Sequence, residues 1–175
     1  MDEIYLDNGY IWSFSAGVTQ ALENKAILNK TAFYPQSGGQ PSDTGILEHG
    51  SEIFQVVGAE KAEDEIVHIL DRPGLKPGNM ISGKIDGDRR YRFMRSHTAC
   101  HILSAVIFQE TGAKITGNQI EQSRSRVDFS LESFDKSRMM EYVEKANQIV
   151  SDRRPVSTRI IPREEALAMP DLLRL

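Results

Sequence analysis

The sequence predicts an α+β protein, with a β-rich first part and a second part in which helices and strands mix. Up to residue 85, short apolar or alternating runs are separated by turn signals such as Asp7-Asn8-Gly9 and Asp71-Arg72-Pro73-Gly74. From Arg89 onward the apolar residues repeat at helical spacing. The order of strands, helix, strands, helix, strand and short helix is typical of helices packed on one face of a sheet.

The strands expected in the first part share this alternation, and their spacing predicts a small barrel or a tightly bent sheet. They are Ile4–Leu6, Tyr10–Phe14, Ala26–Asn29, Gly45–Glu48, Ile53–Val57, Ile66–Leu70 and Met80–Ile85. For Ala16–Asn24 a strand and a short helix both fit the pattern. We place a β-rich domain at residues 1–87 and an α/β domain at residues 88–175.

The second part opens with a helix whose buried stripe is expected to hold Phe93, Cys100, Leu103, Val106 and Ile107. Gly112 would end it in a left-handed cap. Lys114–Thr116, Gln119–Ile120 and Arg126–Leu131 follow as expected strands. A second helix spans Met139 to Val150, with Ser133 or Asp135 as its cap. Val156–Ile161 is predicted as a strand and Arg163–Ala168, opened by Pro162, as a short helix.

Composition and charge exclude several classes of protein. Hydrophobic residues make up 39% and charged residues 26% of the 175, which is ordinary for a globular chain. A single cysteine, Cys100, excludes a disulfide scaffold, and no apolar run approaches the ~18 residues of a membrane span. The chain ends on the apolar phrase Asp171–Leu175, so we expect a form shortened relative to a longer domain.

Charge is unevenly distributed along the chain. Residues 1–80 carry 5 Lys and Arg against 12 Asp and Glu, and residues 81–175 carry 16 against 13. The basic residues of the second part allow a local phosphate-binding face. The alternative is that these arginines form ordinary solvated surface.

The strongest chemical signal is the pair His97 and His101. Four residues apart on a predicted helix, they project from one face, the spacing with which a helix offers two nitrogens to one Zn²⁺. A catalytic zinc normally has three protein ligands, so two histidines are not a complete site. The alternative is a pair of surface or hydrogen-bonded histidines. Cys100 should face the core as an inert thiol, and His49 and His68 are more typical of structural or surface residues.

The second signal is the glycine-rich stretch from Thr31 to Gly45. Gly38 and Gly39 let the backbone pass close to another group, while Gln40 and Thr31 add polar side chains. This stretch is either a loop that grips a polar ligand or a hairpin with ordinary turn chemistry. It matches neither the Walker A nor the dinucleotide fingerprint.

Three segments together resemble a known family. They are Thr31–Gly45 (TAFYPQSGGQPSDTG), Ile85–Arg95 (IDGDRRYRFMR) and Ser96–Ala105 (SHTACHILSA). They are similar to the editing domain of alanyl-tRNA synthetase and, more closely, to its free-standing relatives, the AlaX alanyl-tRNA editing proteins. The resemblance runs from Tyr5 to about Pro170.

The resemblance implies a fold, an activity and a set of site residues. The fold would be a small β-barrel-like domain holding the glycine-rich loop, followed by a two-layer α/β sandwich shared with the threonyl-tRNA synthetase editing module. The activity would be zinc-dependent hydrolysis of the ester on tRNA for alanine mischarged with serine or glycine. The protein would act in the cytoplasm and would not bind a membrane. The matching positions are His97 and His101 as zinc ligands and Thr31 and Gln40 in the amino-acid pocket. Beyond the resemblance, the backbone freedom of Gly38 and Gly39 leads us to expect that they contact the substrate. Because they lead directly into the helix of the two histidines, we expect phosphate contacts at the tRNA acceptor end from Arg89, Arg90 and Arg92.

One departure from the family pattern opens a second hypothesis. The family's second ligand pair, Cys-x-x-x-His, has no counterpart, because residues 102–175 contain no histidine and no cysteine. The rival is therefore a shortened, catalytically impaired tRNA-binding relative without a complete zinc site. A third reading is an unrelated metal-dependent hydrolase or small-molecule binder that reuses the fold. A homodimer is left open.

Overall fold

The computed structural model describes residues 1–133, 135–157 and 159–169. The chain divides into two compact units, one formed by Met1–Met94 with Ile120–Gln122 and the other by Arg95–Gln119 with Ser123–Leu175. This division falls inside helix α2 (Gly87–Thr111). The predicted domains, residues 1–87 and 88–175, place their boundary at the start of the same helix and stay a prediction.

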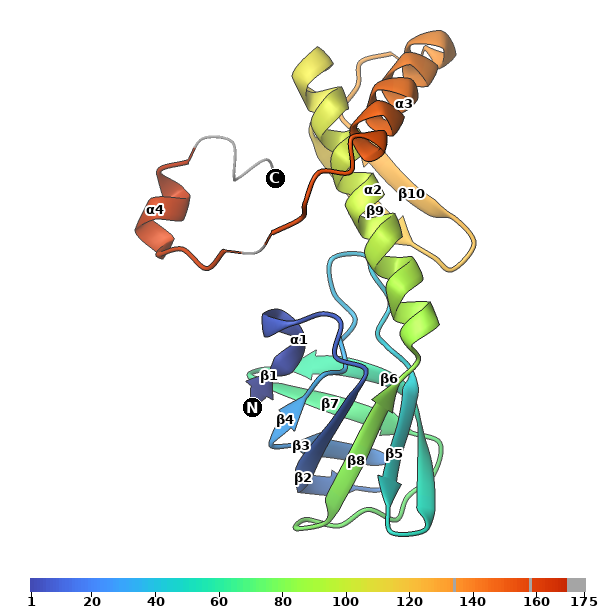
Figure 1. Ribbon diagram of the computed structural model, residues 1–175, viewed down its shortest axis with the longest axis vertical. Helices are drawn as coiled ribbons and strands as arrows, with labels where there is room; N and C mark the ends of the chain where they lie inside the picture. The colour runs from blue at the N-terminus through green and yellow to red at the C-terminus, as the bar shows by residue number, and fades with distance from the viewer. Residues whose placement is uncertain (134, 158, 170–175) are drawn as a thin grey trace. The chain divides into compact units, whose positions relative to one another are not determined.

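The first unit contains a closed antiparallel barrel with the strand order β2-β3-β7-β6-β5-β8 (Figure 1). Its strands are β2 (Ser13–Leu22), β3 (Lys25–Leu28), β5 (Gly45–His49), β6 (Glu52–Ala62), β7 (Glu65–Leu70) and β8 (Met80–Ile85). A closed barrel beside helices confirms the mixed α and β character and the barrel in the first part, while the two-layer sandwich stays a prediction. β2 resolves the ambiguity of Ala16–Asn24 in favour of a strand.

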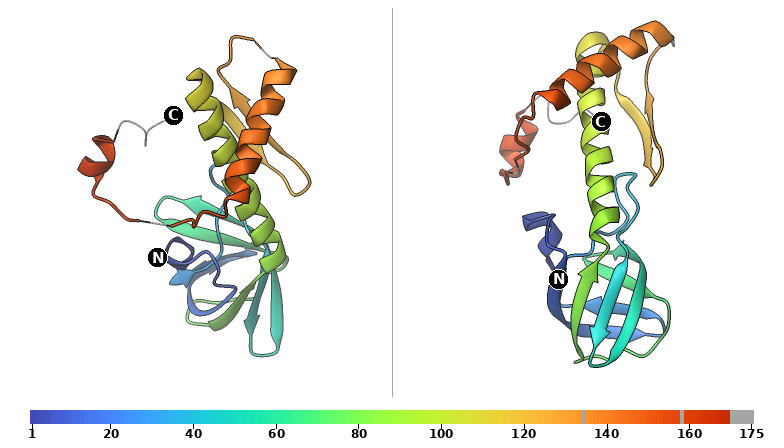
Figure 2. Two further views of the ribbon diagram at one scale, coloured as in Figure 1. Left: turned by 45° about the horizontal axis from the view of Figure 1, so that its top comes forward. Right: turned by 45° about the vertical axis from the view of Figure 1, so that its right-hand side comes forward.

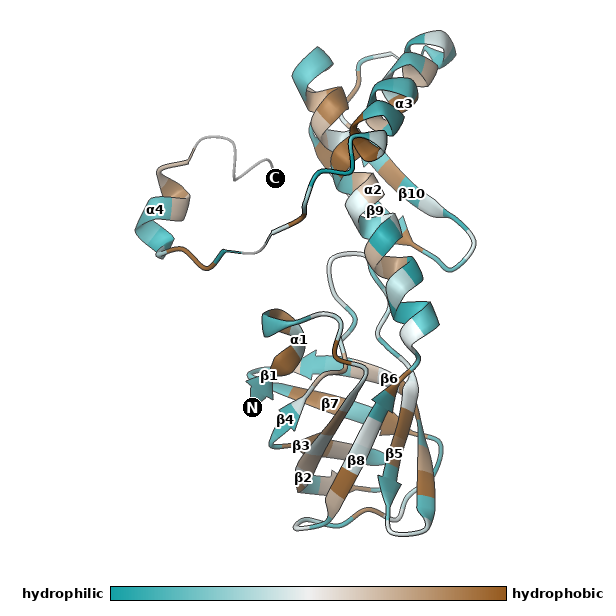
Figure 3. Ribbon diagram, viewed as in Figure 1, coloured by the Kyte–Doolittle hydropathy of each residue, from teal (hydrophilic) through white to brown (hydrophobic). Residues whose placement is uncertain are grey.

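The barrel has one continuous core because side chains along each strand point alternately into the barrel and outward. Along β7 and β8 every second residue is buried. Figure 3 shows that the barrel strands carry both hydrophobic and hydrophilic residues. The inward residues build one core, in which Phe33, Phe54 and Leu47 have no exposed surface. At Gly45 an added Cβ would lie 2.1 Å from the Lys84 carbonyl oxygen, so the close approach of β5 and β8 requires glycine there.

Three very short elements lie beside the barrel. They are β1 (Asp2–Glu3), α1 (Ile4–Asp7) and β4 (Lys30–Thr31). β1 pairs with β4 in parallel, which sets Glu3 opposite Thr31. The predicted strand Ile4–Leu6 is wrong, because these residues form the single helical turn α1, with Ile4 and Tyr5 packed on the barrel core.

The second unit is built on the later part of α2. Against it lie the hairpin of β9 (Ile115–Ile120) and β10 (Ser125–Phe129) and the helix α3 (Lys136–Ser151), as both views in Figure 2 show. Its core centres on Val106, Ile107, Tyr142 and Ala146. The short helix α4 (Arg163–Leu167) follows.

The predicted helix ends are confirmed by the backbone. Gly112 has φ +72°, and its N–H bonds the Phe108 carbonyl at 2.8 Å, so it ends α2 in the left-handed cap. Of the two candidate caps of α3, Asp135 is the one observed: its carboxylate accepts from the N–H groups of Ser137 and Arg138.

A second predicted strand is also wrong. The described residues of Val156–Ile161 form no strand, and Val156 and Ile160 are 84% and 92% exposed, so no neighbouring strand covers them. The apolar phrase Asp171–Leu175 lies outside the described residues. Across the helices of the described chain, none has both the length and the apolarity to cross a bilayer.

Candidate functional site

The glycine-rich stretch is a tight hairpin between β4 and β5. Ser37 and Gln40 exchange backbone hydrogen bonds of 3.1 and 2.9 Å, and Gly38 and Gly39 between them have φ of +58° and +75°. Two central residues with positive φ form the two-residue turn that selects glycine at both places. The turn chemistry therefore accounts for the Gly-Gly pair, and contact of Gly38 and Gly39 with substrate stays a prediction. Both glycines are exposed, whereas Gln40 is buried.

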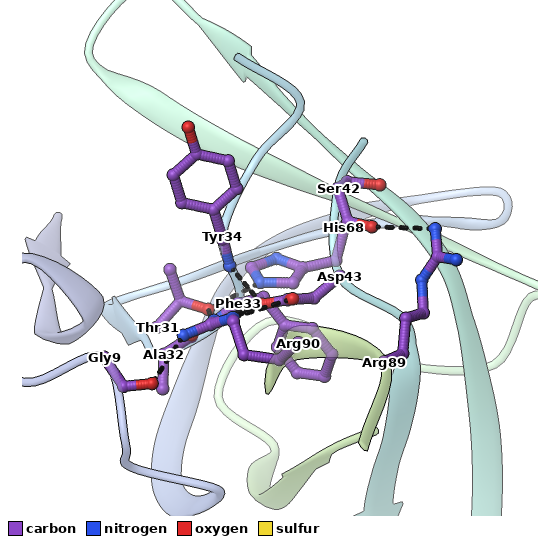
Figure 4. A network of polar contacts seen from close by, with 10 residues as sticks. All are labelled: Gly9, Thr31, Ala32, Phe33, Tyr34, Ser42, Asp43, His68, Arg89 and Arg90. Atoms are coloured by element: carbon purple, nitrogen blue, oxygen red, sulfur yellow. Dashed lines mark hydrogen bonds and ion pairs between the residues drawn. The ribbon is translucent and has the colours of Figure 1, made fainter. Parts of the chain in front are cut away.

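A buried ion pair fastens this hairpin to α2. The Arg90 guanidinium donates from Nε to both carboxylate oxygens of Asp43, at 2.8 and 2.9 Å, and makes a further close ion pair through NH2 (Figure 4). It also donates to the Gly9 and Ala32 carbonyls at 3.0 and 2.7 Å. Asp43 accepts from the N–H of Tyr34 at 2.7 Å. The pair holds the two ends of the hairpin against the first turn of the helix.

The three predicted RNA-binding arginines differ in their environment. Arg90 is 3% exposed and its donors face inward, which favours a structural role over a phosphate contact. Arg89 is half-buried, donates to the Ser42 carbonyl at 3.3 Å and lies 4.5 Å over the ring of Phe93. Arg92 is exposed. Their roles in RNA binding stay predictions, and exposure favours Arg92 among the three.

Thr31 lies at the barrel end of the hairpin and bonds His68 of β7. Thr31 Oγ1 is 2.8 Å from His68 Nε2, and His68 Nδ1 is 3.1 Å from the Ala26 carbonyl oxygen. Neither Thr31 nor His68 has exposed surface. Burial lowers the pKa of His68 to about 4, so its ring is neutral at physiological pH.

The two candidate zinc ligands belong to the second unit. As the spacing predicts, the rings of His97 and His101 lie side by side, with centroids 5.0 Å apart and planes 13° from parallel. Burial, with a smaller contribution from the neighbouring His101, lowers the pKa of His97 and favours the neutral form that binds metals.

The donor set suits Zn²⁺ in kind and would supply two of the four positions of a tetrahedral site. No group of three or more His, Cys, Asp or Glu side chains is arranged so that it could hold a metal ion in residues 1–133, 135–157 and 159–169. These residues therefore do not complete a zinc site by themselves.

Cys100 lines an open groove in the second unit. The groove has a volume of about 710 Å³ and lies between α2, with Ala99, Cys100 and Leu103, and β10, with Val127 and Phe129. The thiol is half-buried rather than in the core, which corrects the expected position. Burial raises its pKa, which favours the protonated thiol, and its inertness stays a prediction.

The sequence alone does not single out Asp43 of the hairpin or His68 of β7, which makes hydrogen bonds to Thr31 and Ala26. Asp43 stands in the motif without an assigned role, and His68 is expected only as a structural or surface residue. A buried histidine in an alternating strand was the available signal for His68. Its partners, Thr31 and Ala26, come from strands distant in sequence, and the sequence does not show that they meet.

Comparison with known proteins matches this chain to tRNA-editing proteins and synthetases. Residues 10–89 match the family model of class II (A) tRNA synthetases. The chain is 45% identical to alanyl-tRNA editing protein AlaX-M of Methanosarcina acetivorans, over 93% of this chain and 70% of that protein. It is 40% identical to AlaX-M of Saccharolobus solfataricus, over 99% of this chain and 74% of the relative.

A longer relative contains the same region as a part. The alanine–tRNA ligase of Ignicoccus hospitalis is 36% identical over 94% of this chain, and the match covers 18% of the ligase. The AlaX-M proteins match nearly the whole chain at 40–45% identity and are covered over more than two thirds of their own length. The chain therefore belongs to the AlaX family of alanyl-tRNA editing proteins.

Proposed function

We propose that the chain is a trans-editing deacylase that hydrolyses the ester of tRNA for alanine mischarged with serine or glycine. The observation that carries this proposal is the 45% identity, over 93% of the chain, to a protein named for alanyl-tRNA editing. In the reaction a water oxygen attacks the ester carbonyl, the bond to the ribose oxygen breaks, and that oxygen leaves with a proton. Because the substrate takes part in translation, we place the chain in the cytoplasm.

Recognition of serine rests on its hydroxyl. Serine differs from alanine by this one group, and a buried acceptor left unpaired by alanine costs about 1–3 kcal/mol, roughly 5- to 150-fold in rate. We assign Thr31 as the partner of that hydroxyl and Gln40 as the second polar residue of the pocket. Thr31 has no exposed surface, so the substrate side chain reaches it only when neighbouring groups move aside. The exposed Gly38–Gly39 turn lets the ester approach the backbone closely.

Zinc enters the proposal through His97 and His101. These residues would supply two ligands, and the other positions would be filled from outside the described residues. Zinc bound there would supply Lewis-acid polarisation of the ester carbonyl. The parallel packing of the two rings and the lowered pKa of His97 support this assignment.

The tRNA would be held by phosphate contacts. Arg92 is exposed on α2, and Arg89 lies one helical turn before it, half-buried. Cationic side chains on phosphates position RNA without reading its sequence. We assign Arg92 first, then Arg89, to the acceptor end of the tRNA; a homodimer stays a prediction.

A second function is favoured by one specific observation. Among the described residues no three metal-ligating side chains come together, which is what a tRNA-binding relative with impaired catalysis would show. A single-turnover assay on seryl-tRNA for alanine, with purified chain in excess and zinc supplied, separates the two. Deacylation above the rate in buffer supports the editing enzyme. Binding of the tRNA without deacylation supports the impaired relative.

A further inference from the structure

The proton positions of the Thr31–His68 pair follow from its partners. A carbonyl oxygen only accepts, so His68 Nδ1, 3.1 Å from the Ala26 oxygen, must carry a hydrogen. The ring is neutral, so Nε2 carries a lone pair. The Thr31 hydroxyl, 2.8 Å away, is therefore the donor in the bond to Nε2.

The environment allows no second arrangement of this ring. Turning it over would place carbon atoms where the two nitrogens now make their hydrogen bonds. Phe33 packs edge-on against the His68 ring, with centroids 5.4 Å apart and an angle of 82°, and His68 has no exposed surface. The imidazole is thus a fixed acceptor for the Thr31 hydroxyl (Figure 4).

These hydrogen bonds determine whether the Thr31 hydroxyl can donate to a ligand or accept from it. Its one proton is given to His68, and one lone pair accepts the Phe33 N–H at 3.1 Å. A hydroxyl has one donor and two acceptor positions, so a single lone pair is left. Towards any third group, Thr31 is an acceptor only.

We infer that His68 is a positioning residue that makes Thr31 an obligate acceptor, so that the pocket distinguishes serine from alanine by the hydrogen bond that the serine hydroxyl donates. This inference rests on the proposed function, in which Thr31 meets the substrate side chain. It adds to that function which group donates the hydrogen bond: the substrate side chain donates and Thr31 accepts. Serine is accepted because its hydroxyl donates, and a group of similar size that only accepts is treated like alanine.

The direct test compares three esters on the same tRNA: seryl, β-fluoroalanyl and alanyl. Fluorine is close to a hydroxyl in size and cannot donate. Each rate is divided by the alkaline hydrolysis rate of the same ester, which removes the inductive effect of fluorine. Selection by donation predicts that the seryl ester reacts at least 10-fold faster than the β-fluoroalanyl ester. Equal normalised rates would overturn the inference.

Variants separate positioning from folding. His68→Phe keeps a ring in the core and removes the acceptor, so the Thr31 proton is released and the ratio of seryl to β-fluoroalanyl rates should fall about 10-fold. Thr31→Val should lower the same ratio, and the double variant should lower it no further than Thr31→Val alone. His49→Phe, at a barrel histidine bonded instead to the Met80 carbonyl, should keep the wild-type ratio. A folded His68→Phe variant with the wild-type ratio would overturn the inference.

Two measurements keep the inference separate from the proposed function. If the wild-type chain hydrolyses none of the esters, the proposed catalytic function is wrong. The preference for a donating side chain is then measured by comparing the affinities of the chain for the seryl and β-fluoroalanyl amides of 3′-amino-adenosine. Tighter binding of the seryl amide supports the inference, and equal binding overturns it. Long-range ¹H–¹⁵N spectra of His68 should show the proton on Nδ1, and a proton on Nε2 would overturn the assignment of the Thr31 donor.

Discussion

The guanidinium of Arg90 and the carboxylate of Asp43 form a buried ion pair in the first unit, and the two side chains are 3% and 1% exposed. This ion pair joins α2 to the glycine-rich hairpin, and Arg90 also donates to the carbonyls of Gly9 and Ala32. An ion pair so deeply buried is costly to break, because the remaining charge has no solvent to replace its partner.

Breaking this ion pair should destabilise the protein strongly. Asp43→Asn keeps the shape and removes the charge, and we expect a loss of about 3–5 kcal/mol in the free energy of unfolding. Glu52→Gln is the matched control, because Glu52 pairs with Arg72 at the surface at 3.4 Å and its loss should cost less than about 1 kcal/mol. Urea unfolding followed by circular dichroism gives both values. Equal losses in the free energy of unfolding for the two variants would contradict the structural role of Arg90.

Stability should fall at acid pH because of His68. Its pKa is about 4 in the folded protein against the ordinary value of 6.5, so its full contribution is present above pH 6.5. As pH falls from 6.5 to 4, the unfolded chain binds a proton that the native state excludes, and about 3 kcal/mol is lost. The difference in unfolding free energy between wild type and His68→Phe, measured from pH 7 to pH 4, should follow this curve. A flat difference for His68→Phe would refute the assignment.

Arg92 should contribute to tRNA binding through its charge. Arg92→Gln should weaken binding and reduce the slope of log affinity against log salt by about one. Lys76→Gln, at another exposed basic residue of the first unit, is the control and should leave the slope unchanged. Filter binding across a salt series measures both. An unaltered slope in the Arg92 variant would remove it from the RNA interface.

Metal binding should depend on both histidines of α2. The purified chain is expected to retain zinc, and His97→Gln or His101→Gln should each reduce its affinity by more than 10-fold, since either removes half of the ligands that the described chain offers. Elemental analysis after dialysis against a competing chelator measures the zinc retained. His49→Gln should retain the wild-type amount. Zinc bound equally well by the His97→Gln, His101→Gln double variant would show that the metal lies elsewhere.

Much of the fold was predictable because it depends on local patterns. The alternation in β7 and β8, the left-handed cap at Gly112 and the Asp135 cap each depend on residues close together in sequence. Val156–Ile161 shows the limit of this reasoning. Its β-branched residues favour a strand, but a strand also needs a neighbour to pair with, and none is present in the described part of the chain.

The candidate site was predictable in its residues but less so in their roles. Spacing along one helix placed His97 beside His101, because both lie on the same element. The partners of Arg90 and Thr31 were not predictable, since each is brought together with its partner only by the folded barrel: Arg90 lies 47 residues from Asp43, and Thr31 lies 37 from His68. The sequence around Arg90 and Thr31 therefore does not show the buried bonds that each residue makes within the protein.

The central claim, that this chain edits mischarged tRNA, is tested most directly by deacylation under single-turnover conditions. Wild-type chain with zinc is mixed with seryl-tRNA and, separately, alanyl-tRNA, both on tRNA for alanine. The account predicts rapid loss of the seryl ester and at least 5-fold slower loss of the alanyl ester. Loss of both esters at the rate seen in buffer alone would contradict it.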